Sequence, residues 1–319
     1  MKKLLVCLMA AGLLLTAYLT PVKAETYVIN DHESFEAEWT LDYFNSPSII
    51  YDPGLALCAL TICASASQMS DAVIINLQAM GFSNIVRLNY DQKIINKPVT
   101  TIASQSSGED YYFIINIRGT RDVEDAVTDV MGGIFNGFIL AGENTYQMYL
   151  DYRHTYCPEA TDAHSYVLIC GHSLGGATAG QLARQFAMKS QIDKNHIYTY
   201  TFASPTYDTE MEDPQDYDNV FNHIISEDIV PTVPWQYGRI GIDIRYTDDA
   251  AAFTFFDYIS TVFYMENWTE RAPAMLSHHS ISSYYAVMKK GNYDNSTALQ
   301  RFFRNLATTV LELAERCLR

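Results

Sequence analysis

The chain has 319 residues, and its 37 acidic and 21 basic side chains give a formal net charge of −16. This acidic balance argues against nucleic acid and anionic membranes as electrostatic partners, but it permits apolar contact with a neutral lipid surface. Hydrophobic residues make up 48 % of the sequence, and the length allows one large α/β domain or two small ones.

The first 24 residues have the pattern of a secretory signal peptide. Two lysines precede an apolar run over residues 4–19, and residues 21–24 (PVKA) supply the small residues that a signal peptidase reads. We therefore expect cleavage near Ala24, secretion, and a single domain over residues 25–319. The alternative is an uncleaved membrane anchor, although the run is short for a membrane span and no later segment is apolar for long enough.

Beyond a polar and aromatic segment that ends near Pro53 and is hard to assign, expected strands alternate with expected helices. Most of the strands are continuous apolar runs, which suit a sheet covered on both faces, while the last one alternates as an edge strand does. This order predicts an α/β fold with a largely parallel central sheet and helices on both faces. The expected helices are 55–67, 71–80, 143–152, 174–188, one beginning near 281, and 297–318; the expected strands are 99–103, 111–117, 165–170, 197–202, 220–225 and 240–246.

The cysteines and acids give little sign of a metal site. Five cysteines follow the leader without any spacing typical of zinc, so we expect no zinc site and at most two disulfides, whose pairing stays open. The acidic stretch 208–219 is interpreted as a solvated loop, with a calcium site as the alternative. We expect neither a metal nor a cofactor. The five cysteines are Cys58, Cys63, Cys157, Cys170 and Cys317.

The strongest chemical signal is the pentapeptide Gly171-His172-Ser173-Leu174-Gly175. It matches the G-x-S-x-G pattern and stands after an apolar strand and before a helix, as a nucleophile elbow must. The two glycines remove side chains that would collide with the neighbouring strand and helix, so that the serine hydroxyl is lifted on a tight turn. The pattern predicts Ser173 as the nucleophile of a hydrolase.

A nucleophilic serine needs a base, and the base needs an orienting acid. In this fold they follow the serine in the order acid, then histidine, which leaves the adjacent pair His278 and His279 as candidate bases. Asp228 follows the expected strand 220–225 and is the predicted acid, because a carboxylate just past a strand lies at the active-site edge of the sheet. Glu227 is the alternative acid.

Two groups are expected to receive the negative charge that develops on the substrate oxygen. The backbone N–H of Leu174 lies at the beginning of the helix after the nucleophile. The second donor should come from a loop after an earlier strand. Strand 111–117 ends in Arg118-Gly119-Thr120, where Gly119 permits close backbone approach and Thr120 offers both an N–H and a hydroxyl. An ordinary turn is the alternative for this segment.

These segments together resemble the class 3 lipase family, the group of the filamentous-fungal triacylglycerol lipases. The resemblance covers about residues 55–285, with departures at Ile117, where the family usually has an aromatic, and at Ala203, where it usually has glycine. It implies the α/β-hydrolase fold and roles for Thr120, Leu174, Ser173, Asp228 and His279. The segments that carry it are Ile117-Arg118-Gly119-Thr120, the glycine-rich run 171–177, Phe202-Ala203-Ser204-Pro205, Asp228-Ile229-Val230-Pro231 and His279-Ser280.

The resemblance implies hydrolysis of carboxylic esters of lipids through a Ser-His-Asp triad and an acyl-enzyme. The substrate is then a lipid or another ester, with transient contact at a lipid–water interface. A phospholipase A1 and a feruloyl-type esterase are alternatives within the same chemistry. A catalytically inactive secreted binding protein on the same fold is the alternative of a different class.

The segment after the oxyanion residues predicts a lid. Its apolar residues recur at helical spacing on one face, while acids and a threonine occupy the rest. In the lipases that the chain resembles, a short helix at this place covers the site in water and swings aside at a lipid surface. A helix packed permanently on the core is the alternative. The apolar residues of this face are Val123, Ala126, Val127, Val130 and Met131.

A mobile lid predicts interfacial activation, because opening exposes an apolar face that a lipid droplet favours and water opposes. Hydrolysis of a short triacylglycerol should rise as the substrate passes its solubility limit. Val127→Asp should blunt that rise and leave the hydrolysis of soluble esters nearly unchanged. Simple saturation of the unchanged protein through the solubility limit would instead indicate an esterase that is always open.

Overall fold

The structure is a computed structural model that describes residues 24–67, 71–90, 98–119, 135–208, 214–233, 237–247 and 276–294. The predicted leader, the predicted lid segment with Thr120, and the expected helix 297–318 lie outside these ranges. Among the helices that the structure describes, none is long and apolar enough to cross a bilayer.

A seven-stranded sheet forms the centre of the molecule, in the order β3-β4-β5-β6-β7-β8-β9. Strands β5 to β9 run parallel, while β3 and β4 join them as an antiparallel edge. The predicted fold class, an α/β fold with a largely parallel central sheet, is confirmed. The strands span Ser83–Leu88 (β3), Thr100–Ser107 (β4), Asp110–Ile117 (β5), Ser165–His172 (β6), Ile197–Phe202 (β7), Val220–Ile225 (β8) and Ile242–Tyr246 (β9).

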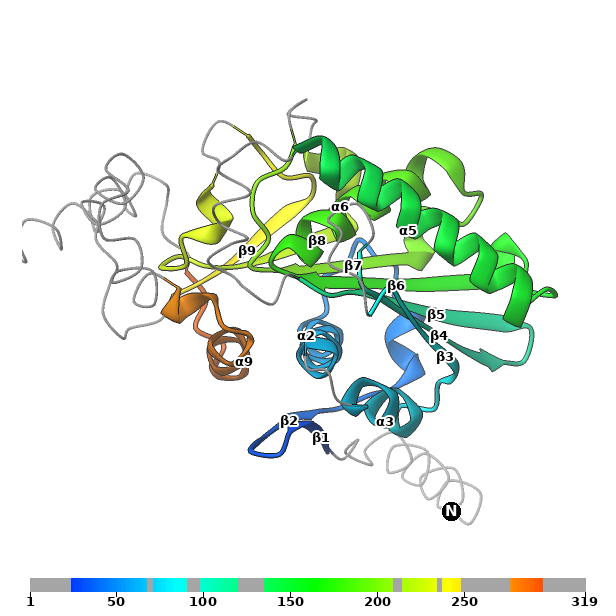
Figure 1. Ribbon diagram of the computed structural model, residues 1–319, viewed down its shortest axis with the longest axis horizontal. Helices are drawn as coiled ribbons and strands as arrows, with labels where there is room; N and C mark the ends of the chain where they lie inside the picture. The colour runs from blue at the N-terminus through cyan, green and yellow to red at the C-terminus, as the bar shows by residue number, and fades with distance from the viewer. Residues whose placement is uncertain are drawn as a thin grey trace, which may run out of the picture.

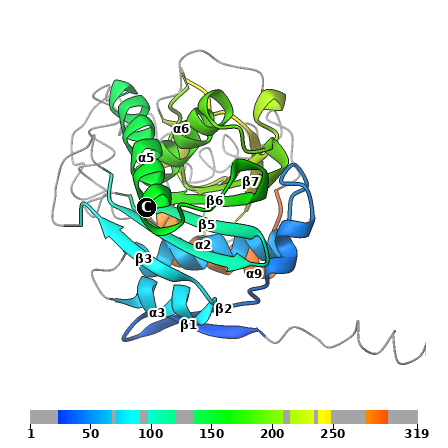
Figure 2. The ribbon, with the colours of Figure 1, turned by 90° about the vertical axis from the view of Figure 1, so that its right-hand side faces the viewer.

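Helices cover both faces of this sheet (Figure 1). Helices α5 (Phe135–Tyr156) and α6 (Leu174–Lys189) lie side by side on one face. Helix α2 (Pro53–Ser67) crosses the other face, with α3 (Ala72–Ala79) and α9 (Ile281–Lys290) packed beside it. Figure 2, a view turned by 90°, shows the sheet between these two layers.

The continuous apolar strands follow from this two-sided cover. In β6, Val167 and Ile169 pack into the core below α5 and α6, while Leu168 and Cys170 face the core around α2. All four side chains are fully buried. Since successive residues of a strand point to opposite faces, a strand in the middle layer favours apolar residues on both of its faces.

The segment before Pro53, which is hard to assign from the sequence, begins with a β-hairpin. Strands β1 (Glu25–Asn30) and β2 (Glu33–Ala37) pair in antiparallel fashion and form a separate two-stranded sheet. The hairpin packs on α2 and α3, on the side of these helices away from the central sheet (Figure 1). Its alternate residues are buried, which is the period of a half-buried strand.

Besides the two strands of the hairpin, strand β3 was missed from the sequence, and one helix was predicted too short. Strand β3 was not predicted because its side chains are exposed or partly buried and do not alternate between buried and exposed. Helix α5 was expected over 143–152 but spans Phe135–Tyr156. The interpretation of stretch 208–219 as solvated is wrong at its first residue, since Asp208 is buried and bonded to Arg184 at 2.8 Å. Cys58, Cys63, Cys157 and Cys170 are buried free thiols.

Close packing of α5 on α6 gives a test of the fold. A Cβ on Gly142 of α5 would lie 2.7 Å from the Cβ of Gln181 in α6. Gly→Ala in an unobstructed helix should raise the free energy of unfolding by about 1 kcal/mol, but overpacking here should lower it by about 1–3 kcal/mol. Urea unfolding of Gly142→Ala decides the sign; Gly238→Ala, where a Cβ meets nothing within 4 Å, is the control. A stabilised Gly142→Ala would contradict this packing.

Candidate active site

Ser173 lies on a strained turn between β6 and α6. Its backbone has φ 58° and ψ −130°, which a residue with a side chain rarely adopts. The Ser173 N–H donates to the carbonyl of Phe202 at the end of β7 over 2.9 Å, so the neighbouring strand holds the turn. A side chain on Gly171 would meet the backbone of Gly175, and one on Gly175 would meet the carbonyl of Ile117. Any side chain at position 171 or 175 would therefore clash with neighbouring backbone.

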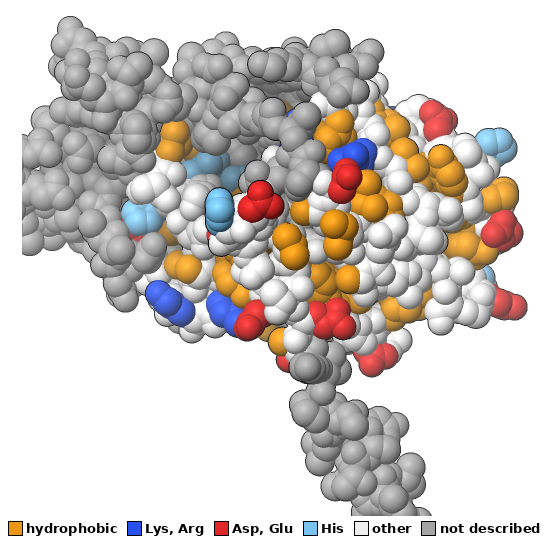
Figure 3. All heavy atoms as spheres, turned by 60° about the horizontal axis from the view of Figure 1, so that its bottom comes forward, with side chains coloured by type: hydrophobic (Ala, Val, Ile, Leu, Met, Phe, Trp, Pro, Cys, Tyr) orange, Lys and Arg blue, Asp and Glu red, His pale blue; other side chains and the backbone are white. Residues whose placement is uncertain are grey.

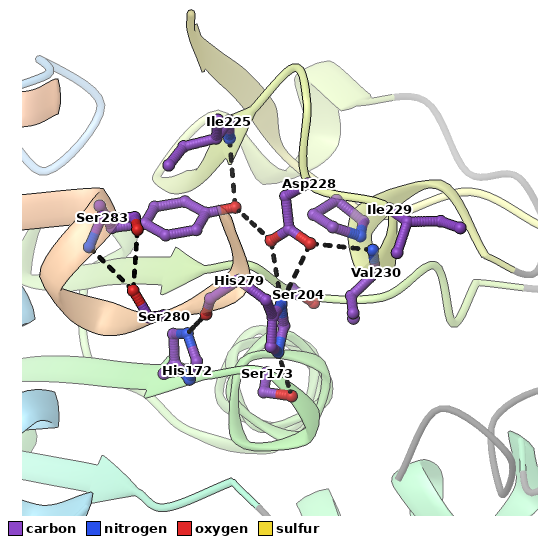
Figure 4. Close-up of polar contacts among 12 residues, drawn as sticks. His172, Ser173, Ser204, Ile225, Asp228, Ile229, Val230, His279, Ser280 and Ser283 are labelled. Atoms are coloured by element: carbon purple, nitrogen blue, oxygen red, sulfur yellow. Dashed lines mark hydrogen bonds and ion pairs between the residues drawn. The ribbon is translucent and has the colours of Figure 1, made fainter. Parts of the chain in front are cut away.

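The structure brings Ser173, His279 and Asp228 together, although they lie far apart in the sequence (Figure 4). The His279 Nε2 lies 2.9 Å from the Ser173 Oγ, and the His279 Nδ1 lies 2.9 Å from the Asp228 Oδ2. All three residues are buried. An imidazole bonded to a carboxylate at one nitrogen and to a serine hydroxyl at the other can take the hydroxyl proton.

Two further groups hold the Asp228 carboxylate. The backbone N–H of Val230 donates to Oδ1 over 3.0 Å, and the hydroxyl of Tyr284 donates to Oδ2 over 2.9 Å. The Tyr284 hydroxyl also accepts from the backbone N–H of Ile225 over 3.1 Å. Burial, and then the charge of Asp228, raise the pKa of Tyr284 well above its ordinary value. Tyr284 thus stays protonated and is one of the donors that a buried carboxylate needs.

His172, the second residue of the expected elbow, supports the backbone of the loop that carries His279. Its Nε2 lies 2.9 Å from the backbone carbonyl of His279, so this nitrogen carries the proton and donates. Burial, and then the nearby His279, lower the pKa of His172 well below its ordinary value. The ring therefore stays neutral and can hold the His279 backbone without adding a charge to the site.

The expected oxyanion donors are only partly within the described residues. Leu174 begins α6, and its N–H is among the first groups of the helix, which have no acceptor inside the helix. Gly119 ends the described part of the loop after β5; a Cβ on it would lie 3.1 Å from the Ser173 Cβ. The loop thus reaches Ser173 at Gly119, and the next residue, Thr120, lies outside the described residues.

The alternative site residues lie elsewhere. The Glu227 carboxylate accepts from the Thr247 hydroxyl over 3.0 Å, whereas Asp228 meets the histidine. His278 is buried beside His279, but it is the His279 Nε2 that faces the Ser173 Oγ. Within the described ranges, no group of three or more metal-ligating side chains comes together.

A cavity of about 570 Å³ adjoins the site. The hairpin contributes Ile29, Glu33 and Phe35 to its wall, and Gly119 and His279 line it as well. This volume is in the range of ligand pockets. The cavity is therefore a concave space next to the group that would receive the serine proton.

Sequence reasoning missed the supporting residues Tyr284 and His172. Tyr284 follows the histidine pair in the sequence, yet nothing in the pattern shows that its hydroxyl turns to Asp228. The departure at Ala203 has a visible consequence: this residue has φ 53°, a conformation that favours glycine. Its N–H donates to the carbonyl of His223 over 3.0 Å, which helps to fix the loop after β7.

Comparison with known proteins links this geometry to one family. Residues 114–238 match the family model described as Lipase (class 3). This segment runs from β5 to the loop after Asp228, so it holds Ser173 and Asp228 but neither the hairpin nor His279. Curated proteins give no match to the sequence.

Solved structures of fungal lipases are among those to which the chain is similar. A lipase of Yarrowia lipolytica is 17 % identical, with 70 % of this chain and 82 % of that one covered at a TM-score of 0.46. A triacylglyceride lipase of Rhizomucor miehei is 17 % identical, with 65 % and 81 % covered at 0.42. A lipase of Rhizopus microsporus var. chinensis is 16 % identical, with 66 % and 77 % covered at 0.43.

The predicted resemblance to class 3 lipases is confirmed by the family match over residues 114–238. With it, the predicted class of enzyme is confirmed, and the chain is a carboxylic ester hydrolase.

The contact between Tyr284 and Asp228 predicts a specific loss. Tyr284→Phe removes one donor from the buried carboxylate, so kcat on a soluble ester should fall by roughly tenfold, the equivalent of one charged hydrogen bond. Tyr112→Phe is the control, because Tyr112 lies near the amino end of β5, whereas Ser173 follows the carboxyl end of the neighbouring strand β6. Equal rates for Tyr284→Phe and the unchanged protein, with both folded, would show that the acid needs no help from Tyr284.

Proposed function

We propose that the chain is a secreted lipase or esterase that hydrolyses carboxylic esters of lipids through an acyl-enzyme on Ser173. The observation that carries the proposal is the pair of 2.9 Å distances from His279, one to the Ser173 Oγ and one to the Asp228 Oδ2. The strained backbone of Ser173 supports it, because strain of this kind persists where the surrounding structure enforces a functional geometry.

In the first step, the His279 Nε2 takes the proton of the Ser173 hydroxyl as Oγ attacks the ester carbonyl carbon. The tetrahedral oxyanion then collapses, the bond to the alcohol oxygen breaks, and the alcohol leaves with the proton from His279. The acyl group stays on Ser173. Asp228 orients the imidazole and stabilises its charge while it holds the proton.

In the second step, a water molecule gives one proton to His279 and attacks the acyl carbon. Collapse of this intermediate releases the carboxylic acid and returns the proton to the Ser173 Oγ. In both steps the Leu174 N–H and Thr120 would receive the oxyanion, and the N-terminus of α6 adds a favourable dipole there. The reaction needs no cofactor.

A neutral lipid suits this chain better than an anionic one, because the protein itself carries a net charge of −16. We propose residues 1–24 as the signal peptide, 25–319 as a single domain, and an extracellular location. The substrate range follows from rates on p-nitrophenyl esters of rising chain length, then on triolein and a phospholipid. A preference for the phospholipid would favour a phospholipase A1.

The triad predicts which residues can be replaced. Ser173→Ala and His279→Gln should each lower kcat by about four orders of magnitude, since the members of a triad act as a unit. His278→Gln should keep most of the activity. Ester hydrolysis and labelling by a fluorophosphonate probe are the measurements, with circular dichroism to check folding. Folded Ser173→Ala within tenfold of the unchanged protein would contradict the proposal; an unlabelled, inactive natural chain would indicate a binding protein.

A further inference from the structure

The N-terminal hairpin β1–β2 contacts α9, the helix that begins two residues after His279. The ring of Phe35 in β2 stacks on the ring of Tyr285 in α9, with centroids 3.9 Å apart and planes 7° from parallel. Phe35 is buried together with Ile29 and Ala64, and Ile281 of α9 packs against the same cluster. The hairpin therefore packs on the first turns of α9 through apolar side chains.

Hydrogen bonds also fix the orientation of α9 relative to the hairpin. The Tyr285 hydroxyl accepts from the Glu36 N–H over 2.8 Å and lies 3.2 Å from the Glu36 carbonyl, to which it donates. The Ser282 hydroxyl donates to the Glu33 carboxylate over 2.5 Å. One tyrosine side chain thus joins α9 to both backbone groups of one hairpin residue, which defines the rotation of the helix as well as its distance.

The hairpin itself is anchored on the rigid layer below the sheet. It packs on α2 and α3, and the Asn76 side chain of α3 donates to the Val28 carbonyl over 2.8 Å. An isolated two-stranded hairpin is barely stable in water, so these helices give it its fixed position. On this side of the molecule a few basic side chains lie beside acidic ones (Figure 3). The hairpin links the α2–α3 layer to α9.

His279 needs such an external support. The hairpin and His279 line one cavity of about 570 Å³, and the polar contacts of the imidazole are those to Ser173 and Asp228. Its orientation depends on hydrogen bonds and on the course of the backbone into α9. The His279 N–H donates to the Leu276 carbonyl over 3.0 Å, and its own carbonyl accepts from His172. A shift of α9 would move this short turn as a whole.

We propose that the hairpin β1–β2 is a positioning element for the histidine of the proposed triad. Phe35 and Glu36 hold Tyr285, and thereby α9, so that the His279 Nε2 stays in line with the Ser173 Oγ. This inference rests on the proposed function. Misplacement of a catalytic group by about 1 Å can lower a rate by up to about a hundredfold, whereas substrate binding need not change. The hairpin should therefore affect kcat and leave KM nearly unaltered.

The test compares Phe35→Ala with the matched control Phe44→Ala in the full chain. Phe44 is also buried, but its ring packs on Tyr112 and Tyr198, which lie near the amino ends of β5 and β7. Both variants remove a buried ring and should lower the melting temperature by similar amounts. On a short p-nitrophenyl ester, well below both melting temperatures, Phe35→Ala should lower kcat about tenfold with KM within about twofold. Phe44→Ala should keep kcat within about twofold.

A milder variant covers the case in which Phe35→Ala does not fold. Tyr285→Phe keeps the stacked ring and loses only the two bonds to Glu36, and it should lower kcat about threefold with KM unchanged. Equal kcat losses in Phe35→Ala and Phe44→Ala would overturn the proposal, because burial alone would then explain the effect. Full kcat in Phe35→Ala would overturn it as well, and where Phe35→Ala does not fold, full kcat in Tyr285→Phe would overturn it.

Hydrogen exchange separates this inference from the proposed function. In Phe35→Ala the amides of α9 should exchange at least about tenfold faster, while those of α6 stay unchanged. This readout needs no activity. If the unchanged protein neither hydrolyses esters nor reacts with a fluorophosphonate, the proposed function has failed. If α9 exchange is the same in Phe35→Ala and the unchanged protein, the positioning role has failed, whatever the activity.

Discussion

The left-handed backbone at Ser173 is the constraint on which the rest of the site depends. The surrounding structure holds Ser173 at φ 58°. Gly171 packs against the backbone of Gly175, Gly175 packs against the carbonyl of Ile117, and the Ser173 N–H donates to the carbonyl of Phe202 in β7. Strain of this kind costs about 1–3 kcal/mol and must be stabilised by the surrounding packing. The seven-stranded sheet and α6 supply that packing, so the position of Ser173 is a property of the whole core and not of a loop.

The histidine and the acid are held by a different means. Asp228 is buried with a carboxylate that three donors satisfy, and these come from the His279 ring, the Tyr284 hydroxyl and the Val230 backbone. A buried carboxylate without such partners would be costly. Hydrogen bonds therefore define the orientation of the imidazole and of the carboxylate in this half of the site. Elements that fix the course of the backbone, namely His172 and the hairpin, gain importance for the same reason.

Much of the fold and of the site could be predicted from local patterns. Continuous apolar runs identified the buried strands β5 to β8, because a strand between two helix layers has no polar face. The elbow motif and the chain order of acid and histidine led to Ser173, Asp228 and the histidine pair. The hairpin and β3 remained unassigned, since short or half-exposed strands give a weak periodic signal.

The sequence by itself led to Ser173 as the candidate nucleophile, because a serine between two glycines, after an apolar strand and before a helix, is a local pattern. Tertiary structure decided what surrounds it. The choice of Asp228 over Glu227 depends on which carboxylate faces His279, and the stacking of Phe35 on Tyr285 joins residues 250 positions apart in the chain. Contacts across such separations form only when the sheet and its helix layers bring distant segments together, so no local pattern encodes them.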